Sequence, residues 1–332
     1  MTGNAPFSDP TPGTPGTAIP TVMPWRYALL ICAAALVLGI AGYALTGSAG
    51  SMAATAGFAV GLFAALSAGG RGVAVAGPGF IAACALVLIF PGMPVLLGIC
   101  LALSVMAAVE VARSGTRMSV MVLMGVILFA IATARVGDLR MLALASAGLG
   151  IGYLVIVQLR LSGILRAPQA SRADAVGLGI FLVVGVTVSV GLALTINLPH
   201  AYWIVILFLS RCLMPMQNRP GALLKYGHGA ALGVMAAVLI ELLGTPDAWR
   251  LVLALVAFVV GLRFMPHPLP ISSATMTAGI LLASAPTPGE AAFRAEAVVL
   301  VIALILFLTL FLERIVPKLP DPQPSVQPGR DG

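Results

Sequence analysis

The sequence has very few charged residues. Only 9% of its 332 residues are Asp, Glu, Lys or Arg, whereas about a quarter are charged in an ordinary soluble domain. Hydrophobic residues make up 60% of the chain, and the mean hydropathy is +1.08. A chain this apolar cannot cover a water-soluble surface. The composition therefore excludes a sizeable soluble domain and predicts a polytopic, all-α integral membrane protein.

Reactive and metal-binding side chains are also scarce. The chain has 4 cysteines and 3 histidines, and the cysteines lie within or beside apolar stretches without CxxC spacing. We expect them to be small packing residues and expect no disulfide framework and no metal site. The chain contains no HExxH, GxSxG or P-loop motif. We therefore expect no enzymatic activity and no cofactor.

The chain ends differ in composition from the middle. Residues 1–24 and 317–332 are rich in proline, which predicts two disordered tails. Between them, apolar runs separated by Gly-, Pro- and Arg-containing breaks predict ten to twelve short spans. The twelve-span interpretation places them at 27–46, 52–68, 74–90, 94–112, 118–134, 139–157, 175–196, 200–216, 224–243, 249–265, 271–285 and 296–316.

The positive charge orients these spans. The net charge is +7, and loops on one predicted side hold most of the cations: Arg71, Arg113, Arg117, Arg160, Arg166, Arg172, Arg219, Lys225, Arg263, Arg314 and Lys318. Loops on the other side hold Arg135, Arg140, Arg250 and Arg294, close to acidic residues. Cytoplasmic loops carry the Lys and Arg excess, so both tails are expected in the cytoplasm and nucleic acid is not expected as a partner. The preference for Arg over Lys and the richness in Ala, Gly and Val indicate a GC-rich bacterial genome, and hence the bacterial inner membrane.

An internal repeat divides the chain into two halves. Residues 158–174 form the longest polar interruption, which we interpret as a cytoplasmic linker between six-helix repeats at 25–157 and 175–316. A shift of about 150 residues aligns Arg113 with Arg263 and Arg117 with His267. Because each repeat has an even number of spans, both insert in the same orientation. We therefore predict two parallel repeats, with a transport site between them.

The second half carries a recognisable pattern. Leu198-Pro199-His200-Ala201-Tyr202-Trp203 opens one span, and Lys225-Tyr226-Gly227-His228-Gly229 opens the next, with Gly233 following. This pattern resembles the fusaric acid resistance and aromatic acid exporter family, as a divergent, shorter relative. The resemblance implies export of small aromatic or other organic acids, and a periplasmic adaptor protein as a partner. Ala230 stands where the family has threonine, and the first half has Ala53 where Trp203 would repeat.

Cationic residues near the spans are the first candidates for binding an organic anion. Arg211 lies inside an apolar span, where an arginine costs at least about 2.5 kcal/mol, so it faces a cavity or anion, or else extends to the interface. Arg113 and Arg263, each followed one turn later by a second cationic position, form a symmetric ring that pairs with carboxylates, or else serve topology alone.

Other candidates cluster near the family pattern. His200, Tyr202 and Trp203 form an aromatic gate for ring-bearing substrates or an interface belt. Lys225 and His228 open the following span, where His228 is a packing residue or a titrating group. Glu110 and Glu241 are acids that lie within spans, near their ends, so proton coupling stays open.

The favoured function is an inner-membrane exporter of small organic anions, with its site between the repeats. An anion channel of the same architecture and a non-transporting scaffold that binds an efflux adaptor are the alternatives. The expected partners are the lipid bilayer and the anion. The oligomeric state stays open, with a homodimer as one alternative.

Overall fold

The structure is a computed structural model that describes residues 23–134, 137–165, 169–196, 202–213, 219–264, 270–283 and 288–315. Inside these ranges, the side chains at 211, 219–223, 288–292, 294–295 and 312–315 are outside the described part. Each secondary-structure element of the described residues is an α-helix, which confirms the all-α expectation. The helices are α1 (Trp25–Ile89), α2 (Met93–Ser114), α3 (Met118–Thr133), α4 (Leu139–Gln158), α5 (Arg172–Ile196), α6 (Trp203–Cys212), α7 (Arg219–Leu242), α8 (Asp247–Phe264), α9 (Pro270–Ala283) and α10 (Pro288–Ile315).

Helix α1 is interrupted twice. Its 65 residues would reach about 100 Å as one straight helix, roughly three times the thickness of a bilayer core. Thr46 and Gly47 leave the helical conformation at the first interruption, and Gly69 does so at the second. Both glycines have a positive φ (71° and 63°), which other residues rarely adopt. The helical segments 25–45, 48–68 and 70–89 thus each have about the length of one span, with breaks where the sequence predicts them.

Several helices fit a membrane protein by length and composition. Among the described residues, α1, α2, α4 and α5 are long and apolar enough to cross a bilayer, while α3, α9 and residues 296–311 of α10 are apolar but shorter. Large apolar side chains also point outward, for example Val37, Leu139 and Trp249. In a soluble protein, so much exposed apolar surface would drive aggregation, whereas in a bilayer it contacts lipid.

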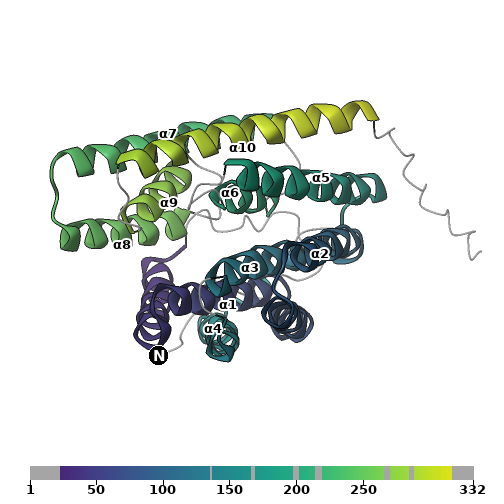
Figure 1. The fold of residues 1–332 in the computed structure, drawn as a ribbon, viewed down its shortest axis with the longest axis horizontal. Coiled ribbons are helices and arrows are strands. Elements are labelled where there is room, and N and C mark those ends of the chain that lie inside the picture. The colour runs from purple at the N-terminus through teal and green to yellow at the C-terminus, as the bar shows by residue number, and fades with distance from the viewer. Residues whose placement is uncertain are drawn as a thin grey trace, which may run out of the picture.

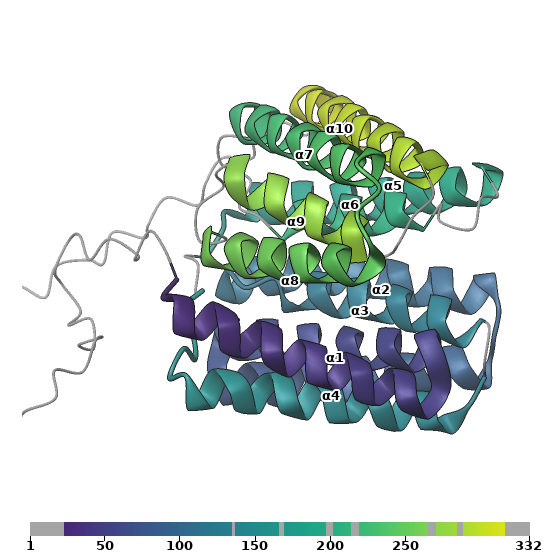
Figure 2. The same cartoon turned by 90° about the vertical axis from the view of Figure 1, so that its left-hand side faces the viewer.

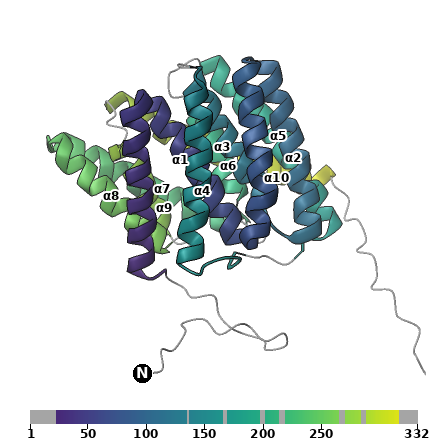
Figure 3. The same cartoon turned by 90° about the horizontal axis from the view of Figure 1, so that it is seen from below.

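The N-terminal helices α1–α4 and the C-terminal helices α5–α10 form two halves that lie side by side (Figures 1 and 2). In the first half, α1 packs on α3 and α4; in the second, α9 packs on α7 and α8, and α10 packs on α5, α6 and α7. Among the described residues, the main contacts between the halves are those of α1 with α8, α2 with α5, and α3 with α6. Helices α1, α4 and α2 run side by side along one direction (Figure 3), so loops gather at the two ends of the bundle.

Glycines bring α4 into main-chain contact with the middle segment of α1. A Cβ added to Gly57 or Gly61 would overlap the main chain of α4, and one added to Gly148 or Gly152 would overlap that of α1. Each helix thus offers a pair of glycines spaced four residues apart. This is the arrangement that lets membrane helices associate closely, because apolar burial gives them no driving force in lipid.

Helices α7 and α10 begin five and eight residues earlier than the sequence predicts. Helix α7 starts at Arg219 rather than residue 224, and α10 starts at Pro288 rather than residue 296. A proline beside an apolar run suggests a break, but a proline in the first helical turn lacks only an N–H that has no helical partner anyway. Helix α6 covers 203–212 of the expected span at 200–216. Residues 200–201 and 214–216 of that span lie outside the described residues, as do the predicted tails apart from Met23 and Pro24.

Candidate functional site

One end of the bundle gathers most of the described cations; we call it the arginine end. The start of α1 meets the end of α8 there, because the amide of Met23 donates to the carbonyl of Arg263 at 2.9 Å. The ends of the middle segment of α1 and of α4 also meet there, since the amide of Gly163 donates to the carbonyl of Ala65 at 3.0 Å. Described cations in loops and helix ends at the arginine end are Arg26, Arg71, Arg113, Arg117, Arg160, Arg172, Lys225 and Arg263.

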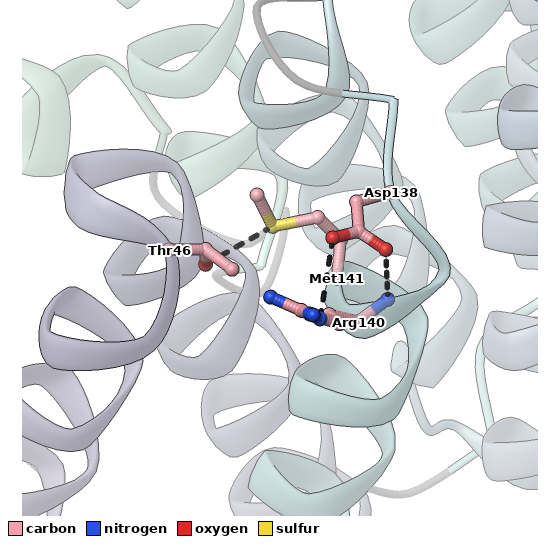
Figure 4. Close-up of polar contacts among 4 residues, drawn as sticks. All are labelled: Thr46, Asp138, Arg140 and Met141. Carbon is pink, nitrogen blue, oxygen red and sulfur yellow. Dashed lines mark hydrogen bonds and ion pairs between the residues drawn. The ribbon is translucent and has the colours of Figure 1, made fainter.

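The opposite end of the bundle carries cations beside acids. Arg140 lies 3.6 Å from Asp138 at the start of α4, and Arg250 pairs closely with Asp247 at the start of α8. Thr46, at the first break of α1, contacts Met141 beside this pair (Figure 4), which places both at the end away from Trp25. The charges of the two ends therefore differ: cations dominate one end, and mixed pairs occupy the other.

Glu110 organises the turn between α2 and α3 at the arginine end. Its carboxylate accepts hydrogen bonds from the Thr116 hydroxyl (2.5 Å), the Met118 amide (2.7 Å) and the Ser119 amide (2.7 Å). The two amides belong to the first turn of α3, where the helix dipole favours a negative charge. Glu110 thus caps α3, which is a structural role and leaves little support for this residue as a proton carrier.

Arg117 follows this turn and lies at the boundary between the halves. Its guanidinium Nη1 donates to the carbonyl of Cys212, the last residue of α6, at 2.6 Å. The side chain is half-buried, and burial lowers the pKa of the guanidinium while the Cys212 thiol opposes that shift. An arginine stays protonated despite such a shift. The result is a permanent positive charge held between α3 of one half and α6 of the other.

Arg263 lies at the α1–α8 contact. Its Nη1 donates to the carbonyl of Met23 at 2.9 Å, and its guanidinium carbon lies 4.3 Å from the centre of the Trp25 ring. Together with the hydrogen bond donated by the Met23 amide, these contacts fix the Arg263 side chain against the start of α1. Arg263 therefore links the two halves as well as contributing charge.

The α2–α5 contact has a related arrangement around Arg113. The side chain of Gln169 donates to the carbonyl of Arg113 at 2.6 Å, and the amide of Ala170 donates to the carbonyl of Val111 at 3.3 Å. The Arg113 side chain itself is exposed. At both contacts, residues just before the first helix of one half form hydrogen bonds to the end of a helix in the other half. Residues before α1 bond to the end of α8, and residues before α5 bond to the end of α2.

The remaining predicted site residues are placed in different surroundings. The Tyr202 and Trp203 rings stack with centres 5.6 Å apart at the start of α6. Lys225 and His228 are exposed on α7, where the His228 ring nitrogen Nδ1 bonds to the carbonyl of Leu224 at 2.8 Å. His200 lies outside the described residues, as do His267 and the side chain of Arg211.

Sequence reasoning placed Arg117 in the cationic ring one turn after Arg113 without singling it out, and it gave Arg113 and Arg263 equal roles. The structure gives each of the three a different neighbour, and the proposed cationic ring remains a prediction. The signal for Arg117 was its place in a short polar stretch with Glu110, Arg113 and Thr116.

Among the described residues, no group of three or more His, Cys, Asp and Glu side chains is arranged to hold a metal ion. Comparisons with protein families, curated proteins and solved structures find no match to this chain.

Proposed function

We propose that this chain is a transporter that moves small organic anions across a bacterial inner membrane. In this proposal, the anion first binds at the arginine end, at Arg117, and then passes between the two halves. The half-buried guanidinium of Arg117 at the α3–α6 contact is the observation that carries the proposal. The aromatic class of the anion rests on the resemblance of residues 198–233 alone.

A repeat of six spans in each half is part of the proposal. Counting the three segments of α1 separately gives α1–α4 six helical segments, and α5–α10 contains six more. The main-chain bonds from Met23 to Arg263 and from Ala170 to Val111 occupy comparable places in the two halves. Both observations support two parallel repeats related by an axis along the membrane normal, the arrangement in which transport sites lie between the repeats.

The orientation follows from the unequal ends. Loops rich in Lys and Arg stay in the cytoplasm during insertion. The arginine end is therefore the cytoplasmic end, and the end with the Asp138–Arg140 and Asp247–Arg250 pairs faces the other side of the membrane. Anions produced in the cell would then meet the cations first, as an exporter requires.

Arg117 suits anion binding for physical reasons. A guanidinium binds a carboxylate through two parallel hydrogen bonds, and partial removal from water strengthens the attraction. Because Arg117 lies between the halves, a bound anion would displace the Cys212 carbonyl from the guanidinium. One link across the α3–α6 contact would thereby weaken. Binding would thereby favour separation of the halves at this end, which is the movement that alternating access needs.

Transport in proteoliposomes tests this assignment. The purified chain would be reconstituted, and uptake of radiolabelled benzoate and related aromatic acids would be measured for the wild type, Arg117→Gln and Arg140→Gln. A charged hydrogen bond contributes about 1.5–3 kcal/mol, so KM should rise about 10- to 150-fold in Arg117→Gln. Arg140→Gln should change little, because Arg140 forms an exposed ion pair at the other end.

Each outcome has a definite meaning. Arg117→Lys, which keeps the charge but loses the planar fork, should recover part of the affinity. If the purified protein gives unitary currents in planar bilayers, it is an anion channel of the same architecture, and the transporter proposal is wrong. If none of the acids in the panel is transported by protein whose elution profile shows a folded monomer or oligomer, the function proposed is wrong.

A further inference from the structure

A second set of cations at the arginine end lies at the α1–α8 contact, apart from Arg117 at the α3–α6 contact. Where α1 meets α8, Arg263 from the second half and Arg26 from the first half lie near the start of α1. Segments 23–45 and 251–264 contain no Asp or Glu. The two arginines therefore form a site of net positive charge on the outer surface of the bundle. We call the contact between residues 23–37, which include the start of α1, and residues 252–264 of α8 the α1–α8 seam.

Arg263 is held in place before any ligand arrives. The Met23 carbonyl accepts its hydrogen bond at 2.9 Å, and its guanidinium lies over the half-exposed Trp25 ring. Arg26 is exposed, and its guanidinium carbon lies 4.9 Å from the centre of the Tyr27 ring. A fixed guanidinium loses little conformational freedom on binding, and a nearby exposed arginine can close on the same anion. The aromatic rings match the depth at which Trp and Tyr gather in membranes.

The rest of the seam is apolar and faces outward. Ala28, Cys32 and Val259 are buried where the two helices touch. Beyond that contact, exposed apolar side chains continue from the arginines toward the middle of the bundle: Leu29, Leu36 and Val37 on α1, and Val252, Leu255 and Val256 on α8. A ligand of this site thus meets cations at one end and hydrocarbon along its length.

We propose that the α1–α8 seam binds an anionic phospholipid, with its phosphate on Arg26 and Arg263 and its acyl chains along the exposed faces of α1 and α8. Guanidinium groups pair with phosphate through two hydrogen bonds, and basic sites between helices on the cytoplasmic side suit anionic headgroups. A small soluble anion would use the charges but would leave the apolar faces without a partner. Since Arg26 and Arg263 belong to different halves, the lipid joins the halves at this end.

Trp25 provides a local measurement, because it lies against Arg263. A protein with Trp203→Phe and Trp249→Phe retains only Trp25, and its fluorescence would be quenched in detergent by brominated phosphatidylglycerol or brominated phosphatidylcholine. A matched protein with Trp25→Phe and Trp203→Phe retains only Trp249, which is exposed near the start of α8, whereas Arg263 lies at the end of that helix. The readout is the ratio of the two lipid concentrations that quench half of the accessible fluorescence.

We expect Trp25 to be quenched at a concentration of phosphatidylglycerol about 30-fold lower than that of phosphatidylcholine. Each arginine near an anionic headgroup contributes about one fivefold step, and the two together correspond to about 2 kcal/mol. Arg26→Gln should reduce this ratio about fivefold, and Arg26→Gln with Arg263→Gln should remove it. Arg140→Gln with Arg250→Gln, which also removes two arginines, should leave it unchanged.

The design separates this proposal from the transport proposal, because it measures binding without flux. Because Arg26 is exposed, Arg26→Gln tests the site even if changes at Arg263 disturb folding. Soluble glycerol 3-phosphate should not compete with the lipid at millimolar concentration. If it does compete, the site binds free anions, and the lipid proposal is wrong. Equal quenching by both lipids at Trp25, or equal selectivity at Trp249, would also overturn the proposal.

Discussion

The contact between α1 and α4 allows a quantitative test of the fold. Gly148 and Gly150 both lie on α4, two residues apart. A Cβ on Gly148 would overlap the carbonyl oxygen of Ala54 on α1, whereas a Cβ on Gly150 would meet nothing within 4 Å. Both Gly→Ala changes bring the same gain in helix propensity, at most about 1 kcal/mol, so that gain cancels when the two variants are compared. The difference between them isolates the overlap at Gly148.

The cost of that overlap can be estimated. The atom in the way is a main-chain oxygen, so the two helices must move apart, and overpacking of this kind costs roughly 1–3 kcal/mol. Gly148→Ala should therefore shift the unfolding equilibrium about 5- to 150-fold further toward the unfolded state than Gly150→Ala. Reversible unfolding in mixed detergent micelles, followed by helical circular dichroism, would measure both. If the two variants unfold alike, α1 and α4 do not approach as closely as the structure has them.

Three further predictions test other elements of the structure. Glu110→Gln should destabilise the protein by about 1–2 kcal/mol in the same unfolding assay, because it removes the charge that caps α3. Glu241→Gln should be neutral or slightly stabilising, because Glu241 lies in the last turn of α7, at the negative end of that helix. Phe208→Leu should cost about 1–3 kcal/mol, because the Phe208 ring stacks on Phe181 at 5.4 Å and covers Gly185, whereas Phe307→Leu on the outer face of α10 should cost less. Ser48→Cys should react with a membrane-impermeant maleimide added outside the cell, whereas Ser162→Cys should react only after the membrane is opened. The four native cysteines are buried and should give a low background. The reverse pattern would overturn the proposed orientation.

The limits of the helices were predictable because they depend on local chemistry. Glycines at the breaks of α1 supply the positive φ that a tight reversal needs, and they stand beside Ser and Arg in an otherwise apolar run. The starts of α7 and α10 were misjudged for an equally local reason, because a proline in the first turn of a helix looks like a proline in a loop. In both cases, the deciding residues lie within a few positions of the boundary.

The contacts at the arginine end were not predictable in this way. Arg117 and Cys212 are 95 residues apart, and Arg263 and Met23 are 240 residues apart. Neither pair shows complementary charge, because the acceptor is a main-chain carbonyl, which every residue possesses. Glu110 illustrates the same point from the other direction. An acid in an apolar span suggests proton transfer, but the amides of α3 that bind it become available only once the α2–α3 turn has formed.

The two halves also differ where the sequence repeat suggests equality. The 150-residue shift matches Arg113 with Arg263, but it places Ala175 where Trp25 stands in the first half. Arg263 is fixed by the Trp25 ring and the Met23 carbonyl, whereas Arg113 contributes its own carbonyl to Gln169 and keeps an exposed side chain. Matching arginines thus form a preorganised cation at one contact between the halves and an exposed one at the other. The fixed arginine suits a resident ligand such as a lipid. The exposed Arg113 suits exchange with soluble anions that approach Arg117, which lies four residues further along the chain.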